Sequence, residues 1–210
     1  MAPPSRRRPT AVRRPNLSRL VRLLIRDIAR RLPELAHVRA ERVLVVAGEA
    51  RRASRATIRP MRFPNGTLRS DSGKRRKPAM RFRGRNILYV ITLRPLFFRS
   101  STPEKRVETI IHELFHAAPA FDGTLDPTHR HAVLGGPAFE KALRPLVKRY
   151  LAACSPDMLA SISFNAEVCV RQWLEKPPNT FAPGRAVRRS YDESQTFLGP
   201  VRMLTRHLRH

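Results

Sequence analysis

Residues 101–119 read S-T-P-E-K-R-V-E-T-I-I-H-E-L-F-H-A-A-P and predict a helix with defined ends. Ser101 or Thr102 can cap its first turn, and Pro103 suits a position at which no amide donor is needed. Apolar residues recur at helical spacing along one side, namely Val107, Ile110, Ile111, Leu114 and Ala118. We expect this stripe to anchor the helix in a core, and Pro119 to end it.

The predicted helix carries the motif H-E-L-F-H at residues 112–116. Residues four apart lie on one face of an α-helix, so His112 and His116 can direct imidazole nitrogens at the same metal ion. Glu113 lies about 100° further round and can reach water held at that ion. Two imidazoles beside a carboxylate are the groups with which zinc hydrolases activate water. The motif therefore predicts two Zn²⁺ ligands and a general base; the alternative is a pair of surface histidines flanking a solvated glutamate.

A catalytic zinc site takes three protein ligands and keeps one position open. His131 follows His116 by 15 residues, past a predicted loop that contains Asp122, Gly123, Asp126 and Pro127, and is the predicted third ligand. His129 is the first alternative, because in an extended segment it would share a face with His131. The remaining alternatives are Asp122 and Glu140.

Other side chains near the motif are candidates for supporting roles. Glu108, one turn before His112, can orient that imidazole or pair with Lys105 in solvent. Tyr89 and Arg130 can stabilise an oxyanion, but packing in the sheet and surface charge are the favoured interpretations for them.

Charge is distributed unevenly along the 210 residues, of which 42 are Lys or Arg and 16 are Asp or Glu, for a net charge of +26. Residues 1–100 carry 27 basic and 5 acidic groups (+22), residues 101–140 carry 3 and 6 (−3), and residues 141–210 carry 12 and 5 (+7). The acidic segment holds four of the seven histidines, which favours a metal site. The basic remainder is expected to attract polyanions such as DNA, and a bias towards arginine codons is the alternative explanation.

Composition predicts one domain with basic extensions. Residues 1–15 are rich in Pro and Arg and are expected to form a disordered arm. Residues 16–178 are expected to form a single domain, and residues 179–210 a basic, loosely ordered tail. Two cysteines, Cys154 and Cys169, are too few for a disulfide framework and are expected to be reduced, buried thiols.

The remaining patterns predict an α+β fold. An amphipathic helix is expected over 19–32, with Ser18 as its cap. Strand-like runs at 42–47, 56–59, 80–82 and 87–93 suggest a small, mostly antiparallel sheet. Further helices are expected over 137–151, interrupted by Pro145, and over 157–175. The longest apolar runs are strand-sized, so no membrane span is expected.

The stretch from 87 to 151 resembles the SprT-like family of minimal zinc metallopeptidases and the related phage-type metallopeptidases. The matching features are a strand ending I-T-L at 91–93, an acidic helix start, I-I-H-E-L-F-H-A, a short loop, a histidine, and G-P-A-F before a helix. The resemblance implies a zincin-like domain in which a small antiparallel sheet packs with the H-E-x-x-H helix and C-terminal helices. Members of that family that degrade proteins on DNA also offer a reason for the basic surface.

These features predict a zinc metallopeptidase that uses Glu113 to hydrolyse protein or peptide substrates near nucleic acid. A non-enzymatic nucleic-acid-binding protein with a structural zinc is one alternative, and a cytoplasmic regulatory protease without DNA association is another. Glu113 favours the enzyme, because a structural zinc site has no need of a general base. The expected location is the cytoplasm, including the nucleoid.

Overall fold

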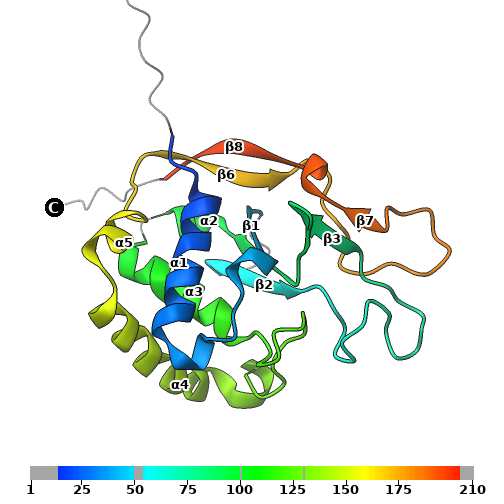
Figure 1. Cartoon of the computed structure of the whole chain (residues 1–210), viewed down its shortest axis with the longest axis horizontal. Helices are drawn as coiled ribbons and strands as arrows, with labels where there is room; N and C mark the ends of the chain where they lie inside the picture. The colour runs from blue at the N-terminus through cyan, green and yellow to red at the C-terminus, as the bar shows by residue number, and fades with distance from the viewer. Residues whose placement is uncertain (1–13, 50–53, 100, 130, 204–210) are drawn as a thin grey trace, which may run out of the picture.

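The computed structural model describes residues 14–49, 54–99, 101–129 and 131–203, without the side chains of residues 131, 132 and 134. The predicted basic arm therefore lies outside the described residues, except for Arg14 and Pro15. Figure 1 shows helices α1, α3 and α4 gathered on one side of the sheets, with β6 and β8 running across the end where α1 begins. Among the described residues, none of the helices combines the length and the apolar character that crossing a bilayer would require.

The central sheet contains β1 (Val43–Ala47), β5 (Tyr89–Leu93) and β2 (Ala56–Pro60), in that order. β1 runs parallel to β5, with Val43 opposite Tyr89, and β2 runs antiparallel to it, with Ile58 opposite Ile91. The predicted strand positions are confirmed, but the sheet is mixed and not mostly antiparallel. The chain between β1 and β5 is long enough for the crossover that parallel strands need, and it contributes β2 on the way.

Helices α1 (Leu17–Arg31) and α3 (Pro103–Phe115) pack side by side against this sheet. Thr102 caps α3 by accepting the Lys105 N–H at 3.3 Å, as one of the two predicted caps. Asn16, and not the predicted Ser18, caps α1 by accepting the Arg19 N–H at 3.0 Å. The predicted apolar stripe is buried, namely Val107, Ile110, Ile111, Leu114 and Ala118, but α3 ends at Phe115 and not at the predicted Pro119.

The chain after the motif forms α4 (His131–Ala153), a short α5 (Pro156–Ala160) and a break within α4. Gly135 has φ 70° and ψ 157°, so two helices meet there at a kink. The predicted helix over 137–151 is confirmed in position, but it continues through Pro145. Four residues at helical spacing, Phe139, Leu143, Leu146 and Tyr150, are buried, and their packing outweighs the hydrogen bond that the proline removes.

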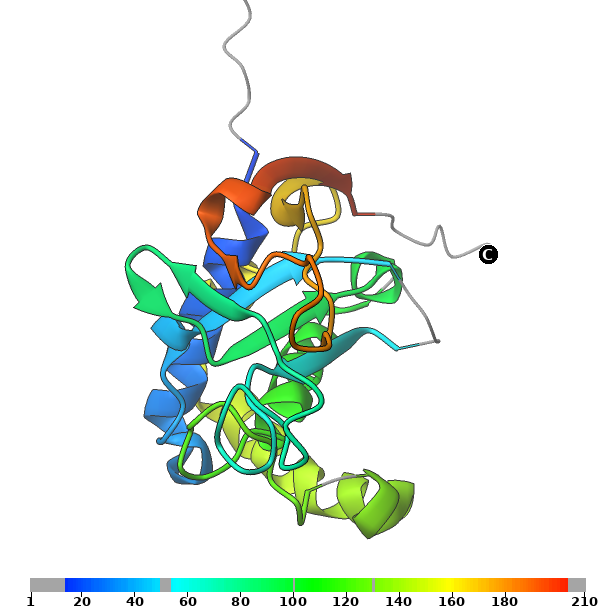
Figure 2. The same cartoon turned by 90° about the vertical axis from the view of Figure 1, so that its right-hand side faces the viewer.

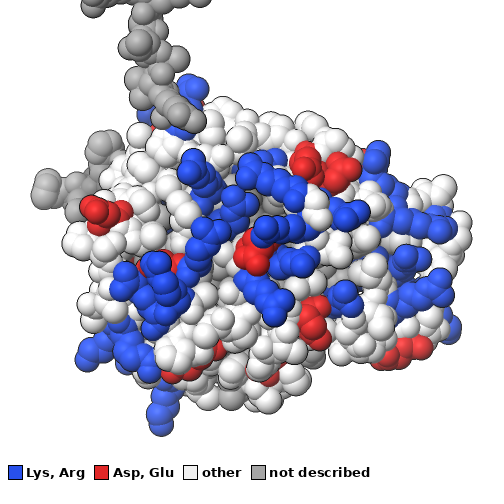
Figure 3. Space-filling view, viewed as in Figure 1, with Lys and Arg blue, Asp and Glu red and all other residues white. Residues whose placement is uncertain are grey.

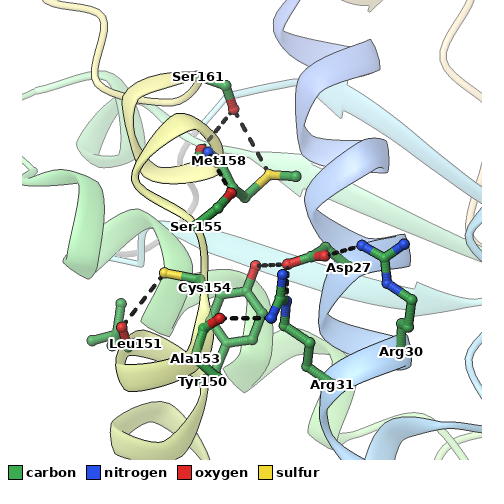
Figure 4. Close-up of polar contacts among 10 residues, drawn as sticks. All are labelled: Asp27, Arg30, Arg31, Tyr150, Leu151, Ala153, Cys154, Ser155, Met158 and Ser161. Atoms are coloured by element: carbon green, nitrogen blue, oxygen red, sulfur yellow. Dashed lines mark hydrogen bonds and ion pairs between the residues drawn. The ribbon is translucent and has the colours of Figure 1, made fainter.

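A polar contact joins α1 to α4 beneath this packing (Figure 4). The Asp27 carboxylate, 3% exposed, accepts the Tyr150 hydroxyl at 2.8 Å, Arg31 Nε at 2.8 Å and a hydrogen bond from Arg30. Arg31 also donates to the carbonyl oxygen of Ala153 at 2.6 Å. Burial alone would raise the pKa of Asp27, but the hydrogen bonds from Arg30, Tyr150 and Arg31 outweigh burial and hold that pKa below its ordinary value.

The last predicted helix, over 157–175, is wrong beyond Ala160. Here β6 (Glu167–Trp173) pairs antiparallel with β8 (Thr196–Arg202) along its whole length. Val168 and Val170 of β6 are fully buried while Cys169 between them is half-buried, which is the alternation of a strand. β8 lies in the segment expected to be a loosely ordered tail, so that segment contains a paired strand.

A smaller sheet, in the order β4-β3-β7, covers the other face of the central sheet. Its strands are β3 (Ala79–Phe82), β4 (Arg85–Asn86) and β7 (Ser190–Tyr191), and Figure 2 shows them in front of the central strands. Met80, Phe82 and Tyr191 pack there with Leu44, Val46 and Val90. The remaining short elements are α2 (Pro95–Phe98) and the 3-10 turns η1 (Pro33–Leu35), η2 (Ala40–Arg42) and η3 (Glu193–Gln195).

Candidate metal centre

The H-E-x-x-H motif lies at the C-terminal end of α3, where the helix stops at Phe115. His116 is the capping residue, and its side chain is almost completely buried. The ring centroids of His112 and His116 are 5.1 Å apart. The structure therefore brings the two predicted ligands together, one helical turn apart, as their spacing requires.

A backbone carbonyl fixes the protonation of the second histidine. His116 Nδ1 lies 2.6 Å from the carbonyl oxygen of His129, and a carbonyl can only accept a hydrogen bond. Nδ1 must therefore carry the proton, so in the neutral ring the lone pair belongs to Nε2. Metal-binding histidines are oriented in the same way, by a hydrogen bond from the ring nitrogen that does not bind the metal.

The loop after α3 folds back to this histidine. The Asp126 N–H donates to the carbonyl oxygen of His116 at 2.9 Å, and His129 follows three residues later. Tyr89 fixes the middle of the loop: its hydroxyl donates to the Thr124 carbonyl at 2.7 Å and accepts the Gly123 N–H at 3.2 Å. Burial raises the pKa of Tyr89 to about 12. Tyr89 therefore packs the loop against the sheet, in agreement with the packing role that the sequence analysis favoured over an oxyanion role.

Glycine is required where this loop meets the sheet. Gly123 has φ +97°, and a Cβ placed there would lie 3.3 Å from the carbonyl oxygen of Leu88 and 3.2 Å from Arg62. The loop consequently lies close enough to the sheet to direct the chain back towards the end of α3.

The predicted third ligand, His131, is the first residue of α4, two residues after the carbonyl that holds His116. Its side chain lies outside the described part of the structure. Within the described part, no three His, Cys, Asp or Glu side chains form a group that could hold a metal ion. The alternative ligands are His129, Asp122 and Glu140. None of these three described side chains completes a set with His112 and His116.

The alternatives have other partners or positions. The His129 ring stacks on Phe115, with centroids 3.9 Å apart, and its Nδ1 lies 3.3 Å from the Asp126 carboxylate. Asp122 accepts the backbone N–H and the hydroxyl of Thr124 at 2.9 and 2.8 Å, while Glu140 is exposed on α4. The contribution of His129 to the centre is its carbonyl oxygen, which sequence reasoning about side chains does not consider.

Phe139 is a component of the site that the sequence analysis missed. Its ring lies 4.8 Å from the ring of His112 and 4.8 Å from that of His116, measured between centroids. The side chain is fully buried and therefore covers both imidazoles from α4. Phe139 is the phenylalanine of G-P-A-F, so it lies in a motif noted in the sequence. The motif gave no indication that this side chain covers the histidines.

Glu113 is 6% exposed and faces the edge of the central sheet. Burial raises its pKa to about 7, although a hydrogen bond from the backbone of Ile58 in β2 and the positive charge of Arg94 act in the opposite direction. A carboxyl group in this range can gain and lose a proton near neutral pH. Of the supporting candidates, Glu108 pairs with Lys105 at 2.7 Å, and Arg130 lies outside the described residues.

The family described as Putative phage metallopeptidase matches residues 10–141 of the chain. The chain belongs to this family. The match spans α1, the central sheet, α3 with its motif and the first part of α4, and it is longer at the N-terminal side than the resemblance read from the sequence. It supports the phage-type part of that resemblance, and the relation to SprT-like proteins stays a prediction. Neither the curated proteins nor the solved structures contain a match to the chain.

Membership of a phage metallopeptidase family implies a metal cofactor. The donor set fits one: two imidazoles lie one turn apart, and a backbone carbonyl fixes the tautomer of His116. Imidazole nitrogens held in this way suit a transition-metal ion. The buried carboxylate of Glu113 beside them suits acid–base chemistry.

Proposed function

We propose that the protein is a zinc-dependent peptidase with His112, His116 and His131 as its metal ligands and Glu113 as its general base. One observation carries the proposal. In a member of a metallopeptidase family, two imidazoles 5.1 Å apart stand beside a buried carboxylate at the edge of a sheet. A structural zinc site would leave that buried carboxylate without a purpose, and burying one is costly.

Zinc, when bound, polarises the substrate carbonyl and lowers the pKa of water towards about 7. Glu113 then takes the proton from the attacking water and delivers it to the departing amine, so that the carboxylate is regenerated at the end of the cycle. The carbonyl oxygen of His129 keeps the Nδ1 proton on His116. The ring of Phe139 excludes water from the faces of the two imidazoles that it covers.

The position of β2 supports a peptide as the substrate. Among the strands that the structure describes, only β5 pairs with β2, and Glu113 interacts with the backbone of Ile58 in β2. An extended peptide can add to such a strand edge through backbone hydrogen bonds. A peptide aligned there would pass beside the general base.

Replacing the base tests the proposal. Glu113→Gln should retain zinc and the fold, because the amide is cheaper to bury than the carboxylate, and should lose about 10²-fold or more of the hydrolysis of an unfolded protein substrate. Glu108→Gln is the matched control, since it removes a partly exposed carboxylate of the same helix that pairs with Lys105, and it should retain activity. Equal turnover in wild type and Glu113→Gln would reject the proposed role. Zinc binding without any hydrolysis would favour the structural-zinc alternative.

We also propose that the enzyme acts near nucleic acid in the cytoplasm. The net charge of +26 supports this, together with the face in Figure 3 on which Lys and Arg side chains gather and few acidic ones lie among them. Anisotropy titrations of the full chain on unrelated duplexes and single strands should show affinity that falls steeply with salt and depends little on sequence. A salt-insensitive or absent interaction would favour a regulatory protease without DNA association.

A further inference from the structure

A cavity of about 280 Å³ lies beside β1, at the opposite end of the central sheet from β2. Its walls come from elements that are far apart in the sequence: Asn16, Ser18, Arg19 and Arg22 at the start of α1, residues 43–45 of β1, Phe82 and Arg83 at the β3–β4 turn, and Arg171 of β6. The histidines and Glu113 of the candidate metal centre do not line it. This cavity is therefore a second site, separate from the hydrolytic one.

Four guanidinium groups, those of Arg19, Arg22, Arg83 and Arg171, line the cavity. In the described part of the chain, no carboxylate forms an ion pair with any of the four. Glu193 lies close to Arg83, but its carboxylate accepts the backbone N–H of Arg83 at 3.1 Å and forms no ion pair with the Arg83 guanidinium. The cavity consequently concentrates positive charge that Glu193 offsets only in part.

The arginines repel one another. Burial lowers the pKa of Arg22, and the neighbouring charges of Arg83, Arg26 and Arg19 lower it further. Burial and the charge of Arg83 likewise lower the pKa of Arg171, although Glu193 acts in the opposite direction. All these groups stay charged at neutral pH, so an anion in the cavity would relieve the repulsion.

The central guanidinium is held in place by its neighbours. Arg171 stacks over the ring of Phe82, with its Cζ 4.5 Å from the centroid, and donates to the Thr196 hydroxyl at 2.7 Å. Its backbone N–H donates to the Ser18 hydroxyl at 2.9 Å, which joins β6 to α1 at the cavity. A planar guanidinium fixed in this way presents paired N–H donors that match the oxygens of a phosphate group.

We propose that this cavity binds the phosphate groups of a nucleic-acid strand and is the point at which the protein holds that strand. The inference rests on the proposed association with nucleic acid and gives it a location. Four arginines from three separate elements line the cavity, so a ligand that carries several phosphates is favoured over a single phosphate. A strand offers such neighbouring phosphates, and an isolated phosphate ion does not.

The test compares two variants that each remove two positive charges from the full chain. Arg22→Gln with Arg171→Gln alters the cavity, and Arg144→Gln with Lys148→Gln alters two exposed residues of α4. Binding of a labelled duplex and of its single strand is followed by anisotropy at several salt concentrations. The cavity variant should bind about tenfold more weakly, and its salt slope on the duplex should fall by about 0.9 for each phosphate that it no longer neutralises. The α4 variant should bind like wild type.

Each other outcome counts against the cavity in a different way. Equal weakening by both variants would show a diffuse basic surface and overturn the cavity while leaving nucleic-acid binding in place. A full chain that binds no oligonucleotide would defeat the cavity and the proposed association together. Loss of binding to phosphatidylserine vesicles, with oligonucleotide binding retained, would assign the cavity to a lipid surface instead. Inorganic phosphate that competes as well as the oligonucleotide would assign it to a free anion.

A second variant covers the case in which Arg171→Gln disturbs the fold. Arg19→Gln with Arg22→Gln leaves the Arg171 contacts to Phe82 and Thr196 intact and should weaken binding to a similar extent. Circular dichroism of each variant checks the fold. Hydrolysis is not a readout here, so failure of the zinc-peptidase proposal would leave the result unaffected.

Discussion

The two edges of the central sheet, formed by β1 and β2, differ in charge and in the chemistry that they can perform. At β2, the buried carboxylate of Glu113 lies against the strand, next to the histidines of α3. At β1, four arginines line a cavity. Burial raises the pKa of Glu113 although the charge of Arg94 acts in the opposite direction, and the four cavity arginines are not among the charges that lower it. The sheet therefore separates a site that needs a proton acceptor from a surface that needs uncompensated positive charge.

The largest effect is expected from removing a metal ligand. Wild type should bind one zinc ion per chain, and His116→Ala should lose the ion and all hydrolysis while nucleic-acid binding stays unchanged. Losing a hydrogen-bond partner of a ligand typically costs roughly 10- to 100-fold in metal affinity, and losing the ligand itself should cost more. Elemental analysis after dialysis, beside an anisotropy titration, measures both quantities.

His129→Ala is the matched control for that ligand. The substitution removes a ring that stacks on Phe115 but keeps the backbone carbonyl that holds His116, so zinc should be retained. Loss of zinc in this variant, together with retention in His131→Ala, would exchange the roles of the two histidines. Full zinc in His116→Ala would place the metal elsewhere. Loss of nucleic-acid binding in His116→Ala would show that the two ends of the sheet are coupled.

The same comparison shows why one end of the sheet is easier to predict from the sequence than the other. The signals of α3 are local: Thr102 caps it, Pro103 begins it, and the apolar stripe and the spacing of His112 and His116 repeat within a few residues. The arginine cavity depends on packing among α1, the β3–β4 turn and β6, which are distant in sequence. Composition predicts that positive charge matters, but only the fold brings Arg22 and Arg171 together.

The errors of the sequence prediction have the same cause, namely packing between elements that are distant in sequence. The segment E-V-C-V-R-Q-W, residues 167–173, falls within the helix predicted over 157–175, whereas its alternation of buried valines fits a strand. Its partner β8 begins beyond a basic, proline-bearing stretch that resembles a tail. At the metal centre, the ligand spacing is visible in the sequence, but the His129 carbonyl and the covering ring of Phe139 follow from how the loop returns.

A smaller effect, on the stability of the fold, is expected at Asp27, which joins α1 to α4. Helix α1 carries two of the cavity arginines, and α4 covers the metal centre. Asp27→Asn should destabilise the fold by about 1–3 kcal/mol, because the buried carboxylate loses charged partners that the amide cannot replace. Glu34→Gln at the exposed pair with Arg149, whose side chains are 43% and 54% exposed, should cost less than about 1 kcal/mol. Urea unfolding measures both changes, and equal costs would contradict the distinction between the buried and the exposed pair.

The contribution of Asp27 should depend on pH in a defined direction. Its pKa is lower in the folded chain than in the unfolded chain, so the unfolded chain binds more protons as the pH falls. The stabilisation is present above an unfolded pKa of about 3.9 and is lost as the pH falls through the folded value. The difference in stability between wild type and Asp27→Asn should therefore narrow in acid and stay constant at neutral pH.

The smallest effect concerns a single partly buried lysine, Lys77, at the β2 edge of the sheet. Lys77 donates to the carbonyl oxygens of Pro60, the last residue of β2, and of Arg62, at 2.8 and 2.7 Å. Burial, with a further contribution from the charge of Arg59, lowers the pKa of Lys77 to about 8. The arginines of the cavity stay charged at this pH, whereas this lysine begins to lose its proton.

Between the folded pKa of about 8 and the unfolded value of 10.5, the unfolded chain binds more protons at this residue than the folded chain does. The stability of wild type relative to Lys77→Met should therefore be constant below pH 8 and rise above it, by on the order of 1 kcal/mol after allowing for partial exposure to solvent. Lys74→Met, which removes an exposed lysine of the same loop, is the control for losing one charge. Urea unfolding across this pH range decides the matter. A relative stability that falls with pH would mean that the ammonium group is stabilised at this end of the sheet, and the contrast with the arginine cavity would then rest on Glu113 alone.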